Sequence, residues 1–353
     1  MIRLRSIDTP PMADFAASPL EKHRFSPPAF AALDLGTNNC RLLVGAPAGD
    51  GFRVIDSFSR IVRLGEGLQS SGVLSTTAMD RAMAALHGCA QRLARRPVRA
   101  VRAIATEACR RATNGPEFLA RVRKETGLPI DVISTREEAE LALESCAPLL
   151  CNGGRRALLF DIGGGSTELA WVRMPERGGA QAPELIGYIS LPIGVVTLAE
   201  RFGHAGDDAD GFQAMVDDVA ERLTPFEAVH SISREIRHGG VSLLGTSGTV
   251  TTLAGIALDL PRYTRAAVDG TTLTLNDAQA ALQRLRELGT AGLASHPCIG
   301  PDRADFVLPG CAIFAAIQAT WPAQHLVVAD RGLREGMLLR MMRAERGYRP
   351  RGR

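Results

Sequence analysis

The chain has 353 residues, of which 45% are hydrophobic and 22% charged, and its formal net charge is +3. This composition is typical of a soluble globular protein and excludes a collagen-like or wholly disordered chain. At roughly 150 residues per domain, the length predicts about two domains. No apolar run approaches the ~18 residues of a membrane span, and the N-terminus lacks the apolar stretch of a secretory signal. We therefore expect a cytoplasmic protein with no membrane contact.

The basic residues and the cysteines limit the kinds of site that the chain can form. Seven scattered cysteines without a C-x-x-C motif favour reduced thiols over a disulfide framework or a zinc site. The net charge is too small to indicate a specific nucleic-acid partner.

Only Lys22 and Lys124 among the 41 basic residues are lysines. Without a P-loop lysine, a bound phosphate has to be held by arginines, backbone amides or a metal.

From Phe30 onwards, short apolar runs alternate with amphipathic stretches, which predicts an α/β protein. The proline-rich residues 1–28 are predicted to be a disordered extension. Strands are predicted at residues 30–35, 40–46, 52–63, 100–105, 130–134, 157–162, 168–173, 185–191, 241–244 and 325–329. Helices are predicted at residues 76–95, 115–126, 136–149, 194–202, 211–237, 249–258, 276–288, 303–320 and 331–346.

Helix ends are marked at two places. Ser75 has the residue type and position of an N-cap for the helix that follows it. Asn114 and Glu117 have the spacing of a capping box, and Gly127 is placed to end the same helix in a left-handed conformation.

The sequence Leu33-Asp34-Leu35-Gly36-Thr37-Asn38 recurs in altered form about one domain later as Phe160-Asp161-Ile162-Gly163-Gly164-Gly165-Ser166-Thr167-Glu168. Each copy is an apolar strand that ends in Asp, followed by a glycine-bearing turn and a second apolar strand. The spacing is too long for a solenoid repeat and suits a duplicated domain. We expect two similar domains that each present one turn to a shared cleft.

The DIGGGSTE turn has the composition of an anion cradle. Consecutive glycines permit positive φ angles and leave backbone amides uncovered, and Ser166 and Thr167 add hydroxyl donors. Asp161 and Glu168 flank the turn and could hold a hard cation that bridges to phosphate oxygens. A plain hairpin turn is the structural alternative, but such turns favour Asn-Gly or Asp-Gly.

Two further segments are candidate walls of the same cleft. Gly245, Thr246, Ser247, Gly248 and Thr249 follow an apolar strand and open a helix, where amides and the helix dipole favour an anion, although hydroxyls there are often only caps. Arg110 and Arg111 follow the strand VRAVRAI, where guanidinium groups can bind phosphate. A solvated helix face is an equal alternative for Arg111.

Seven motifs in order resemble the exopolyphosphatase and guanosine pentaphosphate phosphatase (Ppx/GppA) family, within the actin, sugar kinase and Hsp70 superfamily. They are ALDLGTN, ATEACRRATN, ISTREEAELA, DIGGGSTELA, LPIGVVTL, LLGTSGTVTTLA and ADRGLREGMLL, and they span residues 31–341. The resemblance implies two ribonuclease-H-like domains with an active site in the cleft between them. It further implies Mg²⁺-dependent hydrolysis of the terminal phosphate of inorganic polyphosphate or of guanosine pentaphosphate.

The resemblance also implies roles for individual residues. Glu138 matches the base that activates water. Arg110 matches a position in the phosphate-binding walls and is predicted, with Glu138, to be catalytic. Asp161 and Glu168 match positions near the Mg²⁺ ion. Matches to the phosphate-binding walls are Asp34, Gly36, Thr37, Asn38, Gly163, Gly164, Gly165, Ser166, Thr167, Gly245, Thr246, Ser247, Gly248 and Thr249.

Glu138 has a second interpretation from the residues alone. Thr135 to Glu138 form a T-x-x-E capping box, in which the glutamate would bond to the Thr135 amide. The family usually has glycine where this chain has Thr135, so the departure strengthens the structural alternative. The resemblance favours the catalytic one.

The resemblance divides the chain into a ribonuclease-H-like domain I at 29–142 and domain II at 143–330. A C-terminal helix at 331–346 is expected to pack back on domain I, followed by an arginine-rich tail at 347–353. Polyphosphate or guanosine pentaphosphate is the expected partner, and a homodimer is left open. A kinase of the same superfamily and a module that only binds alarmones are the rival functions.

Overall fold

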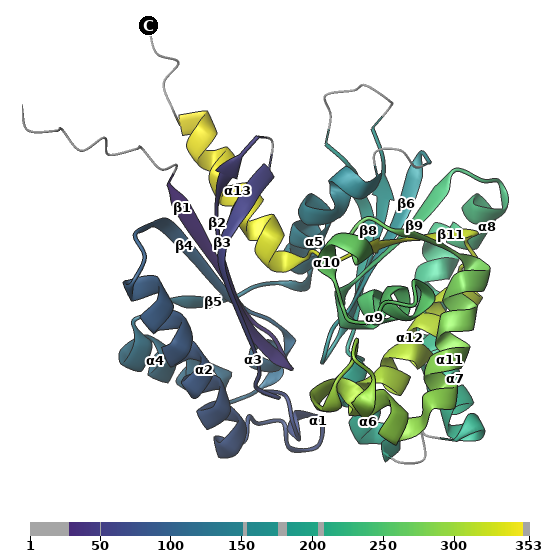
Figure 1. The fold of residues 1–353 in the computed structure, drawn as a ribbon, viewed down its shortest axis with the longest axis horizontal. Coiled ribbons are helices and arrows are strands. Elements are labelled where there is room, and N and C mark those ends of the chain that lie inside the picture. The colour runs from purple at the N-terminus through teal and green to yellow at the C-terminus, as the bar shows by residue number, and fades with distance from the viewer. Residues whose placement is uncertain (1–27, 50, 151–153, 176–181, 204–207, 349–353) are drawn as a thin grey trace, which may run out of the picture.

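The computed structural model describes residues 28–49, 51–150, 154–175, 182–203 and 208–348, which form two β-sheets with helices on both faces (Figure 1). The extension predicted at 1–28 falls almost wholly outside these residues, as does most of the predicted tail. No helix in the described part of the chain combines the length and hydropathy that a membrane span needs.

The first sheet has the strand order β3-β2-β1-β4-β5. The first three strands are antiparallel neighbours, and β4 and β5 run parallel to β1. One face is covered by α2 (Thr76–Ala94) and α4 (Gly115–Thr126), whose apolar stripes pack on Leu33 and Leu35. The strands are β1 (Ala29–Leu35), β2 (Asn39–Ala48), β3 (Gly51–Ile61), β4 (Val98–Ala105) and β5 (Ile130–Val132).

The second sheet repeats this order as β8-β7-β6-β9-β11, with β10 added at its edge. The pairing repeats as well, because β6, β7 and β8 are antiparallel neighbours and β9 and β11 run parallel to β6. The predicted duplication and the predicted pair of ribonuclease-H-like domains are therefore confirmed. The strands are β6 (Arg156–Ile162), β7 (Thr167–Arg173), β8 (Glu184–Leu191), β9 (Val241–Thr246), β10 (Thr272–Thr274) and β11 (His325–Ala329).

Alternating side chains of β6 face two different helix layers. Leu158 and Phe160 lie in the larger core, against α6 (Val195–Phe202), α7 (Ala209–His230), α9 (Ser247–Ala257), α11 (Leu275–Ser295) and α12 (Val307–Thr320). Ala157 and Leu159 face the opposite way, against α5 (Thr135–Leu150). This period of two is the pattern of a strand that is covered on both faces.

Helices α5 and α13 (Leu333–Tyr348) lie side by side between the two sheets (Figure 1). Met337 and Leu338 of α13 pack on Phe30 and Leu43 of the first sheet. Helix α5 packs mainly on the second sheet, although Leu141 joins the core under α13. The two helices thus close one end of the cleft between the two sheets.

Several predicted helices differ from the observed ones. The helix predicted at 211–237 is two helices, because Ser231 is left-handed with φ 50° between α7 and α8 (Ile232–Arg237). The helix predicted at 303–320 begins as the 3₁₀ helix η2 (Pro301–Phe306). Helix α11 runs past the predicted residue 288 but is interrupted at Gly289. Strand β10 and the short helices α1 (Leu68–Ser71), α3 (Glu107–Arg111) and α10 (Arg265–Val268) were not predicted.

Two of the three predicted helix-end features are observed in the structure. The Ser75 hydroxyl accepts from the Ala78 amide, and Gly127 ends α4 with φ 73°, so both predictions are confirmed. The capping box at Asn114 is wrong. Its side chain instead bonds to both backbone groups of Leu74, at 2.8 and 2.9 Å, and so ties α4 to the loop before α2.

Candidate active site

Two strand pairs bring matching residues to the cleft from the two sheets. Asp34 on β1 lies opposite Arg41 on β2, and Asp161 on β6 lies opposite Glu168 on β7. Directly opposed residues of an antiparallel pair point to the same face. The two hairpins are therefore equivalent, except that the second has a carboxylate where the first has a guanidinium.

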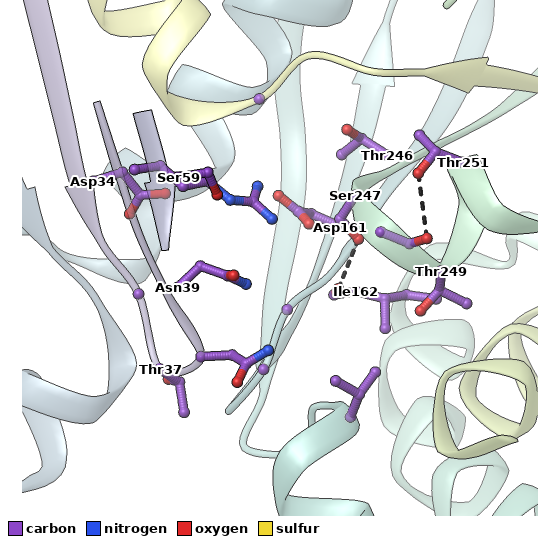
Figure 2. A pocket seen from close by; sticks show the side chains of 18 of the residues that line it. Asp34, Thr37, Asn39, Ser59, Asp161, Ile162, Thr246, Ser247, Thr249 and Thr251 are labelled. Carbon is purple, nitrogen blue, oxygen red and sulfur yellow. Dashed lines mark hydrogen bonds between the residues drawn. The ribbon is translucent and has the colours of Figure 1, made fainter. Parts of the chain in front are cut away.

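Both hairpins border one cavity of about 1130 Å³ between the sheets. Figure 2 shows Asp34, Thr37 and Asn39 on one side of it, facing Asp161, Ser247 and Thr249 on the other. Most of the site residues predicted from the sequence line this cavity. They are Asp34, Gly36, Thr37, Asn38, Glu138, Asp161, Gly163, Gly164, Gly165, Ser166, Glu168, Thr246, Ser247, Gly248 and Thr249.

The glycines of the DIGGGST turn allow close packing rather than an unusual backbone conformation. None of the three has a positive φ, which corrects that part of the sequence argument. A Cβ atom at Gly165 would lie 2.6 Å from the Thr37 hydroxyl, and one at Gly164 would lie 3.0 Å from Asn38 Cβ. In the described chain, the amides of Gly164 and Gly165 have no hydrogen-bond acceptor, so they are free to donate to an anion.

Helix α9 begins at Ser247 and directs its first-turn amides at the cavity. Ser247 has a φ of 77°, a rare conformation for a residue with a side chain, and its hydroxyl donates to the Ile162 carbonyl at 2.6 Å. The Thr246 hydroxyl donates to the Arg331 carbonyl at 2.5 Å. These two hydroxyls therefore fix the helix start to its neighbours, and the amides and Thr249 remain for an anion.

Three predicted site residues do not line the cavity. Thr167 is buried, and its hydroxyl donates to the Ile193 carbonyl at 2.7 Å. Gly245 packs against the ring of Phe160, where a Cβ atom would lie 2.5 Å from the ring. Arg110 reaches the site through Glu138, and it bonds to protein groups alone in the described chain.

Arg110 holds the Glu138 carboxylate in place. Its Nη1 donates to Glu138 Oε1 at 2.5 Å and to the Ile133 carbonyl at 2.8 Å, and its Nη2 donates to Glu107 Oε2 at 2.6 Å. Glu138 is 5% exposed and lines the cavity. Its carboxylate thus points away from the backbone of its own helix.

The capping-box interpretation of Glu138 is therefore wrong. The hydroxyl of Ser134, one residue earlier than the predicted cap, accepts from the Glu137 amide at 3.2 Å. Within the described residues, the Glu138 carboxylate accepts from Arg110 and not from the Thr135 amide, so it does not cap its own helix.

Burial shifts the acidity of the carboxyl groups around the cavity. It raises the pKa of Glu138 to about 7, against the opposing effect of Arg110. Burial raises the pKa of Asp161 to about 6, with Arg41 opposing and Asp34 adding to the rise. It also raises the pKa of Asp34, and that of Glu168 well above its ordinary range.

The arginines of the cavity were missed from the sequence. Arg41, Arg303 and Arg334 all line it. Arg303 donates to the Gly248 carbonyl at 2.7 Å and to the Thr252 hydroxyl at 3.0 Å, which fixes it beside the start of α9. Arg41 had a usable signal, because it is the one charged residue in the apolar run CRLLVGA.

A model of the Ppx/GppA phosphatase family matches residues 44–345 of the chain. The chain belongs to the Ppx/GppA phosphatase family.

Solved structures of Ppx/GppA proteins share this fold over nearly their whole length. A family member from Aquifex aeolicus has 27% identity and a TM-score of 0.73, with 90% of this chain and 98% of that one covered. An exopolyphosphatase from Cytophaga hutchinsonii has 25% identity and a TM-score of 0.79, with the same coverage. An exopolyphosphatase-like protein has 27% identity and a TM-score of 0.80. Family membership makes this chain a phosphatase and disfavours the kinase and the pure binding module.

The carboxylates of this cavity could bind a cation that also contacts the phosphates of the substrate. Asp34, Asp161 and Glu168 line one cavity, and Asp34 Oδ1 and Asn38 Oδ1 are buried with no hydrogen-bond partner among the described residues. Within the described residues, no three acidic, histidine or cysteine groups are close enough to hold a metal by themselves. Mg²⁺ usually binds through one or two carboxylates together with substrate phosphates, so the residues fit that ion.

Proposed function

We propose that this protein is a Mg²⁺-dependent exopolyphosphatase, which releases the terminal phosphate of inorganic polyphosphate. The observation that carries the proposal is the buried Glu138 carboxylate, held by Arg110 and facing the same cavity as the free amides of Gly164 and Gly165. A base and an anion cradle on one cavity are what hydrolysis of a phosphoanhydride needs.

Glu138 is proposed to take a proton from the attacking water. The water oxygen bonds to the terminal phosphorus, the bond from that phosphorus to the bridging oxygen breaks, and the bridging oxygen stays on the shortened chain. A pKa of about 7 suits this task, because a base is most effective when its pKa lies near the working pH. Arg110 is a positioning residue, which keeps the carboxylate pointed at the cavity.

The amides of the two turns and of the α9 start are proposed to bind the oxygens of the terminal phosphate. The fold fixes these amides before the substrate binds. They can therefore stabilise the negative charge on the phosphoryl oxygens in the transition state without reorganising. Asp161 and Glu168, with Asp34 nearby, would hold Mg²⁺. The ion would supply positive charge against the phosphate oxygens.

Guanosine pentaphosphate is the alternative substrate, because it presents the same terminal phosphoanhydride. The observation that favours it is Tyr263, which lines the cavity and offers an aromatic ring to a nucleobase. Its hydroxyl donates to Asp330, which fixes the ring in place.

The test measures phosphate release from long-chain polyphosphate and from guanosine pentaphosphate, each with Mg²⁺ and with a chelator. The proposal predicts Mg²⁺-dependent release from polyphosphate, with a higher kcat/KM than for the nucleotide. A matched variant is Glu140→Gln, on the same helix but half-buried, away from the cavity and paired with Arg136. It should retain wild-type activity, whereas Glu138→Gln should not. Preference for the nucleotide would favour the alternative substrate.

A further inference from the structure

Arg334 is a cavity-lining guanidinium with almost no partner in the protein. Its side chain is 18% exposed, and no described residue forms a hydrogen bond with it. Among the described residues, the one carboxylate oxygen within 4.0 Å of its guanidinium nitrogens is Glu335 Oε1, 3.8 Å from Nη2. That carboxylate is already engaged by the Gly332 amide at 2.9 Å and by Arg265 at 3.1 Å.

Such a placement is unfavourable for a protein without an anion. A half-buried guanidinium with unused donors loses part of its hydration, and no protein group replaces that part. Arg334 is also the second residue of α13, a helix of 16 residues, so the positive end of the helix dipole lies beside its charge. Burial and the nearby Arg41 lower the pKa of Arg334, although Glu335 and Asp34 oppose them.

The neighbouring arginines separate into two groups. Arg303 donates to Gly248 and Thr252, and Arg331 is bonded to Asp269, so both have structural partners. Arg41 resembles Arg334 instead, because it lines the cavity and has neither a hydrogen bond nor an ion pair within the described chain. It lies near Asp34 and Asp161, whose pKa values it lowers against the larger, opposing effect of burial.

We propose that Arg334, with Arg41 beside it, binds a phosphoryl group of the polyanionic substrate other than the one in the glycine cradle. The cavity then has two anion subsites. The first is formed by the turns and the α9 start, and the second by the start of α13 and β2. This inference rests on the proposed function, since it assigns a second phosphate of the same substrate. It makes Arg334 a determinant of preference for phosphate chains over a single phosphate.

The test measures binding and folding in a chelator, so that it does not depend on turnover. Tripolyphosphate and orthophosphate are the probes, and the readouts are the apparent Kd of each and the melting temperature without anion. The variants are Arg334→Met and Arg334→Lys. The matched control is Arg340→Met on the same helix, where Arg340 pairs with Glu144 at 2.5 Å and lies away from the cavity.

Arg334→Met should raise the Kd for tripolyphosphate about tenfold to a hundredfold, the usual effect of losing charged hydrogen bonds. Arg334→Lys should lie between it and wild type, because lysine keeps the charge and loses the fork. The melting temperature of Arg334→Met without anion should equal or exceed that of wild type. Arg340→Met should show the opposite pattern, with a lower melting temperature and unchanged affinity.

Two results would overturn the proposal. One is a melting temperature that falls in Arg334→Met while the Kd for tripolyphosphate stays within twofold of wild type, which would make Arg334 structural. The other is an equal loss of affinity for orthophosphate, which would place Arg334 at the site of a single free phosphate. If the wild type hydrolysed neither substrate, the proposed function would be wrong. The binding results would still test the role of Arg334, because they do not depend on turnover.

Discussion

Arg110 Nη1 lies 2.5 Å from Glu138 Oε1, although the two residues are 28 positions apart on different helices. The same guanidinium is anchored by the Ile133 carbonyl and by Glu107. The Glu138 carboxylate is buried, lines the cavity and accepts a hydrogen bond from Arg110. Arg110 therefore fixes the orientation of this carboxylate. This relationship leads to the first prediction.

Replacing Arg110 with Met should shift the pH dependence of hydrolysis. Arg110 lowers the pKa of Glu138 against the effect of burial, so its removal should raise that pKa further. A base works only when deprotonated, so the acidic limb of the kcat/KM profile should move to higher pH. A profile measured between pH 5 and 9 would check this, and an unmoved limb with a uniformly lower rate would contradict it.

Replacing Glu168 with Gln should weaken the response to Mg²⁺. Glu168 lies opposite Asp161 on the adjacent strand, and both carboxylates line the cavity. Loss of one of two carboxylates should raise the Mg²⁺ concentration for half-maximal activity, about tenfold or more. A titration of phosphate release against Mg²⁺ measures this. An unchanged midpoint would exclude Glu168 from the ion.

Replacing Gly165 with Ala should impair activity through packing between the two turns. The added Cβ would lie 2.6 Å from the Thr37 hydroxyl, so one turn must retreat from the other. We expect kcat/KM to fall at least about tenfold, because catalysis is sensitive to displacements of ~1 Å. The control is Gly88→Ala in α2, whose new Cβ would lie 3.5 Å from Phe58 and make an ordinary contact. Equal activity of both variants would be the contrary result.

Replacing Asp161 with Asn should stabilise the metal-free protein at neutral pH. Burial raises the pKa of Asp161 from 3.8 to about 6, so its contribution to stability is fully present below pH ~4. That contribution is lost as the pH rises through 6, because the folded protein must then bury a charge. The gain from Asn should therefore reach at most about 3 kcal/mol at pH 7.5 and vanish near pH 4.

Denaturant unfolding of wild type and Asp161→Asn at both pH values, in a chelator, measures this difference. The reference variant is Asp218→Asn, since hydrogen bonds from Arg201 hold the pKa of Asp218 below its ordinary value, although partial burial acts in the opposite direction. This variant should lose stability at pH 7.5. The two substitutions should thus act with opposite sign, and the same sign for both would refute the electrostatic account.

The two glycine turns were predictable because each motif is local and the duplication relates the two. Asp34 and Asp161 lie near the ends of equivalent strands, so the duplication was enough to predict that both residues line one cleft. Thr167 was assigned wrongly because a motif groups adjacent residues, whereas successive side chains of a strand point to opposite faces. Ser166 lines the cavity, and Thr167 next to it is turned into the core.

Other features depend on contacts between distant segments, which local patterns do not encode. The Thr135 capping box was plausible until Arg110 offered Glu138 a charged partner from another helix. Arg334 lies within the motif ADRGLREGMLL, but no local pattern showed that its side chain would face the cavity without a protein partner, because that depends on α13 packing on the first sheet. The break at Ser231 was missed because a left-handed residue other than glycine is rare.

The most direct measurement compares phosphate release and melting temperature for Glu138→Gln and wild type. Glutamine can still accept from Arg110 but is no base near neutral pH, so the account predicts a melting temperature close to that of wild type. Turnover of polyphosphate should fall about 10² to 10⁴-fold. A stable variant that keeps most of its turnover would contradict the account, because the proton of the attacking water would then have another acceptor.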